Sequence, residues 1–161
     1  MRPSQKDTKT LIRDYYYVIN KQIPKIKQDL LDKEKEIDDI ISALTLSANK
    51  ISDEVHGSGI SKPVERIYEE KERICNLFKS SLEDLRTELE QCLKKERIYK
   101  KWFADSELNE KEEDVIRYTY SDGLIDWKIA SKVGYESRTV RRIRKKALEK
   151  LSANVLIDVI Y

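Results

Sequence analysis

Arginine and lysine side chains are concentrated in one short stretch near the carboxyl end of this 161-residue chain. Residues 137–151 hold seven basic residues and one acid, Glu149, and so carry a net charge of +6 in a chain whose total is +2. The basic residues are Arg138, Arg141, Arg142, Arg144, Lys145, Lys146 and Lys150. Guanidinium groups can pair with guanine edges, and the other cations can displace counterions from phosphates, so the available chemistry is nucleic-acid binding.

The apolar residues of the same stretch recur with the period of an α-helix. They are Val140, Ile143, Ala147, Leu148 and Leu151. At 100° per residue, Arg138, Arg141, Arg142 and Lys145 project opposite this apolar stripe, whereas Arg144 falls near its edge. Charge runs often mark a solvated helix face only, but here acidic partners at i,i+4 spacing are nearly absent. The pattern therefore predicts a helix over 137–151 that fits the DNA major groove.

Two shorter helices are predicted immediately before this basic stretch. Helix-start residues are Asn109, which forms a capping box with Glu112, then Asp126, and Ser137 for the basic helix itself. The stops are Asp122-Gly123 and Gly134, because glycine adopts the left-handed conformation without steric cost. Apolar residues recur at helical spacing in both: Val115, Ile116, Thr119, Ile129, Ala130 and Val133. A short helix, a glycine turn and a longer helix are typical of a helix-turn-helix, here packed on a third helix.

The residues of this region resemble region 4 of bacterial sigma factors and the helix-turn-helix of phage late-gene regulators. The shared pattern is Ile129-Ala130, Val133-Gly134, Ser137-x-Thr139-Val140-Arg141-x-Ile143 and Ala147-Leu148-x-Lys150-Leu151, with Leu108, Glu112, Val115-Ile116 and Gly123 upstream. The plan of a charged helical N-terminal part followed by this motif resembles the ArpU/RinA group of phage-encoded activators of late transcription. Trp127 departs from the small polar residue that such domains often have near the start of the second helix.

The resemblance implies double-stranded promoter DNA as the partner. It assigns DNA binding to Ser137, Arg138, Thr139, Arg141 and Arg142, and the charge pattern adds Lys145 and Lys146. Further candidates for contacts with phosphates are Lys100 and Lys101, which precede the predicted motif, and Lys128, which lies in its second helix.

The first two thirds of the chain predict long charged helices. A helix is expected at about 8–22, a break or kink at Pro24, a second helix at 25–51 and a third at 64–103. Apolar residues recur at threes and fours in the last two, with a loop at 52–63 between them, which indicates a coiled-coil-like antiparallel hairpin. The predicted fold class is all-α, with a hairpin domain at 1–104 and a region-4-like DNA-binding domain at 105–161.

Several classes of function are excluded by composition. No run of about 18 apolar residues exists, which argues against a membrane protein, and no apolar signal segment follows the amino-terminal residues. Cys75 and Cys92 lie 17 residues apart in a helical pattern and are expected to be buried, reduced thiols of a cytoplasmic protein in a bacterial host cell. His56 is the single histidine, and no convergent set of catalytic or metal-binding residues accompanies it, so neither an enzyme nor a cofactor is expected.

The last ten residues, SANVLIDVIY, are mostly apolar. Such a tail is expected to dock on the rest of the chain or to pair with a second subunit in a homodimer. The sequence therefore predicts a DNA-binding transcriptional regulator, with host RNA polymerase as a candidate partner. The alternative is a non-catalytic coiled-coil protein that binds RNA polymerase or a sigma factor, with the helix-turn-helix as a scaffold.

Overall fold

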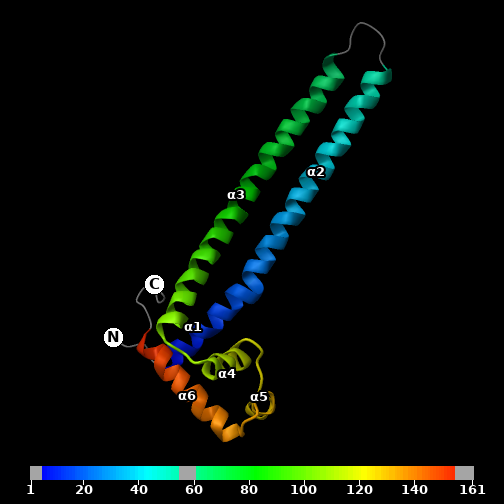
Figure 1. Cartoon of the computed structure of the whole chain (residues 1–161). Coiled ribbons are helices and arrows are strands. Elements are labelled where there is room, and N and C mark those ends of the chain that lie inside the picture. The colour runs from blue at the N-terminus through cyan, green and yellow to red at the C-terminus, as the bar shows by residue number, and fades with distance from the viewer. Residues whose placement is uncertain (1–4, 55–60, 155–161) are drawn as a thin grey trace. The chain divides into compact units, whose positions relative to one another are not determined.

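The computed structural model describes residues 5–54 and 61–154, and all regular structure in these ranges is helical. The elements are α1 (Gln5–Tyr17), the π-helical segment η1 (Val18–Gln22), α2 (Ile23–Glu54), α3 (Ser61–Asp105), α4 (Glu110–Tyr120), α5 (Asp126–Val133) and α6 (Ser137–Ala153) (Figure 1). The predicted all-α fold class is confirmed. Most of the predicted loop at 52–63 and most of the apolar tail lie outside the described residues; residues 52–54 belong to α2 and 61–63 to α3.

Contacts divide the chain into two compact units. We call residues 25–90 the hairpin unit, and residues 1–24 together with 91–161 the terminal unit. The predicted division between 104 and 105 differs from this one. The reason is that α1 and the last turns of α3 pack with α4 and α6, so both ends of the chain contribute to one core.

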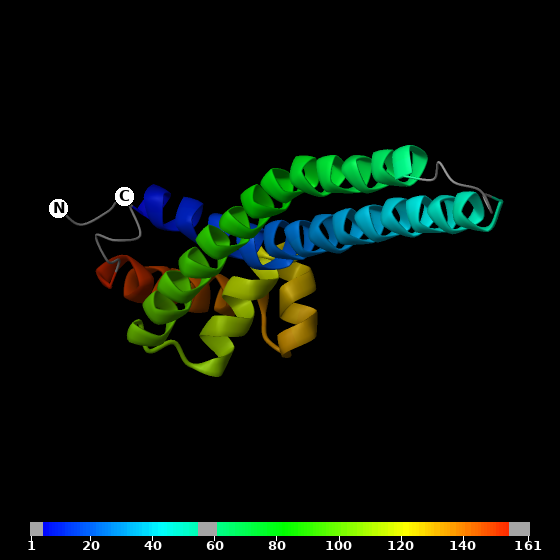
Figure 2. The same cartoon turned by 90° about the horizontal axis from the view of Figure 1, so that it is seen from above.

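The hairpin unit consists of α2 and α3, which run side by side in opposite directions (Figures 1 and 2). The Lys33 ammonium lies 4.7 Å from the centre of the Phe78 ring, and Arg86 donates to Glu34 at 3.3 Å. Further along α2, Thr45 accepts a hydrogen bond from Lys71 at 3.0 Å. From Glu34 to Thr45 along α2 the hydrogen-bond partner falls from Arg86 to Lys71 along α3, which agrees with the predicted antiparallel hairpin.

The seam of the hairpin unit is only half-buried. Its apolar positions are Leu30, Ile37, Ile40, Ile41, Leu44 and Ala48 in α2, and Ile67, Ile74, Phe78, Leu82, Leu85 and Leu89 in α3. Their spacing of threes and fours is that of a coiled coil. Among the residues between 27 and 90 whose burial the structure describes, none is fully buried. Two helices alone therefore leave the edges of the apolar stripe in solvent.

The sequence predicts a break or kink at Pro24, and the helical path has no break there. A proline inside an α-helix lacks its N–H donor, and its ring clashes with the carbonyl four residues earlier. Here Val18–Gln22 widens into a π-helical turn, in which the Ile23 N–H donates to the Val18 carbonyl, and Pro24 then falls in the first turn of α2. The wider turn removes the clash, so the chain stays helical from α1 into α2.

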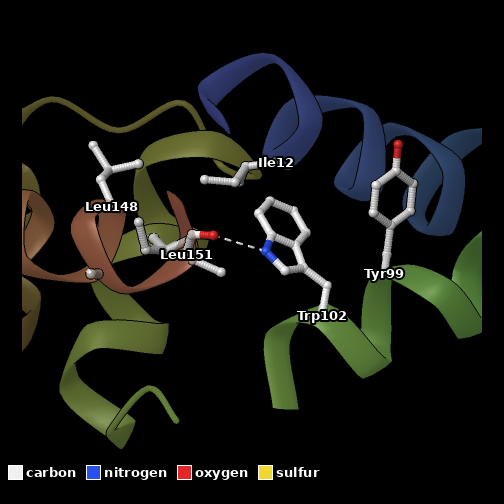
Figure 3. Close-up of a cluster of buried hydrophobic side chains, with 7 residues drawn as sticks. Ile12, Tyr99, Trp102, Leu148 and Leu151 are labelled. Carbon is white, nitrogen blue, oxygen red and sulfur yellow. Dashed lines mark hydrogen bonds between the residues drawn. The ribbon is translucent and has the colours of Figure 1, made fainter. Parts of the chain in front are cut away.

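The core of the terminal unit is built around Trp102, which is fully buried. Its indole packs with Ile12 of α1, Tyr99 of α3 and Leu148 and Leu151 of α6, together with Ile116 and Ala147 (Figure 3). The indole Nε1–H donates to the Leu151 carbonyl oxygen at 3.0 Å, which satisfies a polar group that burial would otherwise penalise. The Tyr99 hydroxyl donates to the Asp14 carboxylate. The core around Trp102 thus contains side chains from α1, α3, α4 and α6.

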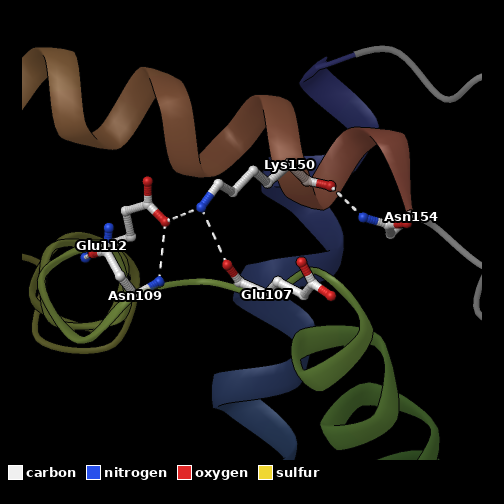
Figure 4. Close-up of polar contacts among 5 residues, drawn as sticks. All are labelled: Glu107, Asn109, Glu112, Lys150 and Asn154. Atoms are coloured by element: carbon white, nitrogen blue, oxygen red, sulfur yellow. Dashed lines mark hydrogen bonds and ion pairs between the residues drawn. The ribbon is translucent and has the colours of Figure 1, made fainter.

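A buried carboxylate ties α4 to α6. Asn109 caps α4 by accepting from the Glu112 N–H at 2.9 Å, and Glu112 accepts from the Asn109 N–H at 3.1 Å, as the capping box predicts. The same Glu112 oxygen accepts from Lys150 Nζ at 2.7 Å (Figure 4). Burial of Glu112 raises its pKa, but the hydrogen bonds from Lys150 and the Asn109 backbone outweigh it, and the net pKa is lowered. The carboxylate is therefore held ionised between the two helices.

A second apolar cluster joins α5 to α4 and α6. Val115, Ile129, Ala130 and Val140 are buried in it, as their helical spacing predicts. Gly134 ends α5 with a left-handed φ of 73°, which confirms the predicted stop. The predicted starts are displaced by one residue. Asp126 and Ser137 are the first residues of α5 and α6, and no side-chain hydrogen bond caps either helix.

The two cysteines differ in burial. Cys92 is buried, as expected, but Cys75 is exposed because it lies outside the apolar stripe of α3. The expectation of burial was wrong for Cys75.

Removing the Ile12 side chain should destabilise the whole terminal unit. We expect Ile12→Ala to lower its free energy of unfolding by about 2–5 kcal/mol, because a cavity opens beside Trp102. The measurement is chemical denaturation followed by tryptophan fluorescence, since both tryptophans lie in this unit. Ile125→Ala, at a residue 55% exposed, is the matched control and should change stability by less than about 0.5 kcal/mol. Equal effects of the two changes would contradict this core.

The Glu112 carboxylate should contribute stability that depends on pH. We expect Glu112→Gln to cost about 1–3 kcal/mol at pH 7, because it removes a charge-assisted bond to Lys150. Since the folded-state pKa of Glu112 is lowered, its contribution is complete above the unfolded pKa near ~4.3 and is lost as pH falls through the folded pKa. Urea denaturation from pH 7 to pH 3 should therefore show that the difference in free energy of unfolding between Glu112→Gln and wild type shrinks as the pH falls. The exposed Glu149→Gln control should show no comparable gap.

Candidate nucleic-acid interface

The outer side of α6 presents four exposed cations. Val140, Ala147, Leu148 and Leu151 are buried on its inner side, which directs Arg138, Arg142, Lys145 and Lys146 to solvent. Within the part of the chain that the structure describes, no carboxylate forms an ion pair with any of these four. Their charges therefore remain available to an external anion.

Arg141 and Arg144 are used differently from the other basic residues of α6. Both donate to the carboxylate of Asp126, the first residue of α5: Arg141 Nε at 2.8 Å and Arg144 at 2.6 Å. The Arg144 side chain is 23% exposed, which agrees with its predicted place at the edge of the apolar stripe, whereas that of Arg141 is 67% exposed. Asp126 thus links α5 to α6 through two arginines.

The two arginines also set the ionisation of Asp126. Hydrogen bonds from Arg144 and then Arg141 hold the pKa of this carboxyl below its usual value. Asp126 was predicted only as a helix cap, and its role as a shared acceptor has no signal in the sequence. Its partners lie 15 and 18 residues away on another helix, so only the packing of α5 against α6 brings them together.

Ser137 and Thr139 lie in the first turn of α6 and are half-buried. Ser137 and Arg141 line an open hollow of about 490 Å³ together with Leu124, Ile125, Asp126 and Trp127. Ile125 and Trp127 are exposed large apolar side chains, and Trp127 has 61% of its surface in solvent. Sequence reasoning noted Trp127 only as a departure from the family pattern, but the structure brings it to the predicted DNA-binding residues.

The three candidate phosphate contacts are all exposed. Lys128 lies on α5 with its ammonium 5.5 Å from the centre of the Trp127 ring, beside the hollow. Lys100 forms an ion pair with Glu96 at 2.7 Å, one turn earlier on α3, and the hydrogen bond from Lys100 to Glu96 raises the Lys100 pKa. Lys101 follows it on α3. Lys128 is thus the one of the three that the structure places with the α6 residues.

The two units carry opposite net charge. The terminal unit has 21 basic and 14 acidic residues, a net charge of +7, whereas the hairpin unit has 11 basic and 16 acidic residues, a net charge of −5. The small total charge of the chain therefore hides a segregation by unit. An approaching polyanion is attracted to the terminal unit and repelled by the hairpin unit.

No three His, Cys, Asp or Glu side chains among the described residues converge where a metal ion could bind. In the same residues, no helix is long and apolar enough to cross a membrane. Comparison of the chain with family models, with curated proteins and with solved structures finds no match. The similarity to region 4 and to the ArpU/RinA regulators therefore rests on the sequence motif alone.

Proposed function

We propose that the protein is a sequence-specific DNA-binding transcriptional regulator that places α6 in the major groove. The observation that carries the proposal is the outer side of α6, where Arg138, Arg142, Lys145 and Lys146 are exposed and form no ion pair with a described acid. In this proposal α5 and α6 are the two helices of a helix-turn-helix, with Gly134 in the turn between them.

The pairing of Arg141 with Asp126 is compatible with this role. Asp126 engages Arg141 through Nε, so the two Nη groups can contact DNA while this pair stays intact. Arg141 also keeps two thirds of its side-chain surface in solvent. Arg144 is less accessible, and we assign it to the packing of α6 and not to DNA.

The sequence motif supports a narrower proposal, that of a phage or prophage activator of late transcription acting inside a bacterial cell. An activator must also contact the transcription machinery, and host RNA polymerase is the partner of this class. The hairpin unit, with its net charge of −5, is the part of the chain that we assign to such a contact.

The alternative function is that of a coiled-coil interaction protein that binds polymerase or a sigma factor without DNA. The half-buried seam of the hairpin unit favours it, as do the exposed Leu31, Leu46, Tyr68 and Leu77 on α2 and α3. In that case the chain should retain purified polymerase or sigma factor in a pull-down and show no salt-dependent duplex binding.

Removing the outer cations of α6 should weaken duplex binding and its dependence on salt. For Arg138→Ala with Arg142→Ala and Lys145→Ala, the slope of log K against log salt concentration should become shallower by about 0.9 for each phosphate that the variant no longer neutralises. The measurement is fluorescence anisotropy of a labelled duplex from 50 to 300 mM salt, on the order of the range in which such charges are screened.

The matched control removes three exposed lysines of the hairpin unit, Lys27→Ala with Lys35→Ala and Lys79→Ala. It lowers the total charge by the same amount and should leave the slope unchanged. An equal weakening of binding in both variants would mean that net charge alone attracts the duplex and that α6 is not the binding element.

Duplex binding should also change the fluorescence of Trp127. This side chain lines the hollow beside Ser137 and Arg141, whereas Trp102 is fully buried and should not respond. We expect quenching or a shift of emission on titration with duplex, and its loss in Trp127→Phe while anisotropy still reports binding. If Trp127→Phe showed the same fluorescence change on titration as the wild type, the change would not come from Trp127, and the duplex would bind away from the start of α5.

A further inference from the structure

Asp126 leaves one end of the Arg141 guanidinium free. Its carboxylate accepts from Nε of Arg141, at 2.8 Å, and no described residue forms a hydrogen bond with either of the two Nη groups. A guanidinium has five N–H donors in a fixed planar fork. Because Asp126 engages the side of the fork next to the aliphatic stem, the two Nη groups remain at the outer end.

Arg144 has a different place at the same carboxylate. It donates through an Nη group at 2.6 Å to the other Asp126 oxygen, and most of its side chain is covered. One carboxylate therefore fixes a mostly covered arginine with one oxygen and an exposed arginine with the other. The oxygen that accepts from Arg144 ties α5 to α6, and the other oxygen sets the direction of Arg141.

Guanine is the base that the free end of Arg141 fits. Its major-groove edge offers two acceptors, O6 and N7, which match two parallel N–H donors from one arginine. An arginine fixed at Nε loses less conformational freedom on binding than a free one, so it gains affinity for this edge. The hollow beside Arg141, with Ser137 and Trp127 on its walls, is open to solvent and gives a duplex access to the pair.

We propose that Asp126 is a positioning residue that holds Arg141 for end-on recognition of one guanine in the bound sequence. This inference rests on the proposed DNA-binding function and deepens it by naming a base and the residue that reads it. Asp126 brings a negative charge next to DNA, which by itself weakens binding to any duplex. Asp126 should therefore raise discrimination in favour of the guanine while it lowers affinity for duplexes of any sequence.

The test begins with selection of bound duplexes from a random-sequence library by the full chain. Each guanine common to the selected duplexes is then replaced by adenine, and separately by 7-deazaguanine, which lacks N7. In the wild type, one guanine should show a roughly ten- to hundredfold drop in affinity on replacement by adenine, and this drop should disappear in Arg141→Ala. The same guanine should respond to 7-deazaguanine.

Asp126→Asn is the decisive variant, because the amide has the same shape but no charge. We expect it to reduce discrimination at that guanine at least fivefold, while affinity for a duplex of unrelated sequence stays equal or rises. In an Arg141→Ala background, Asp126→Asn should have no further effect on discrimination. Arg144→Met is the control for a merely structural role of Asp126, and it should keep the discrimination of the wild type.

Three results would overturn the inference. Unchanged discrimination in Asp126→Asn, with salt-dependent duplex binding intact, would refute the positioning role and leave the proposed function standing. A drop in discrimination in Arg144→Met equal to that in Asp126→Asn would show that Asp126 acts through the packing of α6 alone. Absence of salt-dependent duplex binding by the wild type would refute the proposed function together with the inference.

Discussion

The burial of Trp102 is the constraint on which the terminal unit depends. A side chain of this size needs apolar partners on all sides and an acceptor for its N–H, and no single helix supplies both. The partners come from α1, α3 and α6, and the acceptor is the Leu151 carbonyl near the end of α6. Helices that are distant in the sequence are thereby fixed to one another, and the position of α6 is set by its packing on Trp102.

Two acids then fix the orientation of α6 about its own axis. Asp126 engages Arg141 and Arg144 in its first half, and Glu112 engages Lys150 near its end. These pairs, with the apolar contacts of Val140 and Leu148, allow only one side of the helix to face solvent. The basic residues of α6 are thus divided between a set that positions the helix and a set that points outward, and the outward set together with Arg141 carries the proposed function.

Much of the fold follows from local patterns in the sequence. The Asn109–Glu112 capping box, the glycine stop at Gly134 and the apolar stripe of α6 were predictable, because each depends on residues within a few positions of one another. The contribution of Ile12 to the core of the terminal unit was not, since nothing in the residues around it specifies a partner so distant in the chain. The shared role of Asp126 could not be predicted for the same reason, because the packing of α5 against α6 decides it.

The pairing of the two ends of the chain has a consequence for biosynthesis. Ile12 leaves the ribosome about 140 residues before Leu151, and the core that contains both cannot close until Leu151 has emerged. Any product of premature termination within α6 lacks this core, exposes Trp102 and is open to proteolysis. Only chains synthesised as far as Leu151 can therefore form the core of the terminal unit.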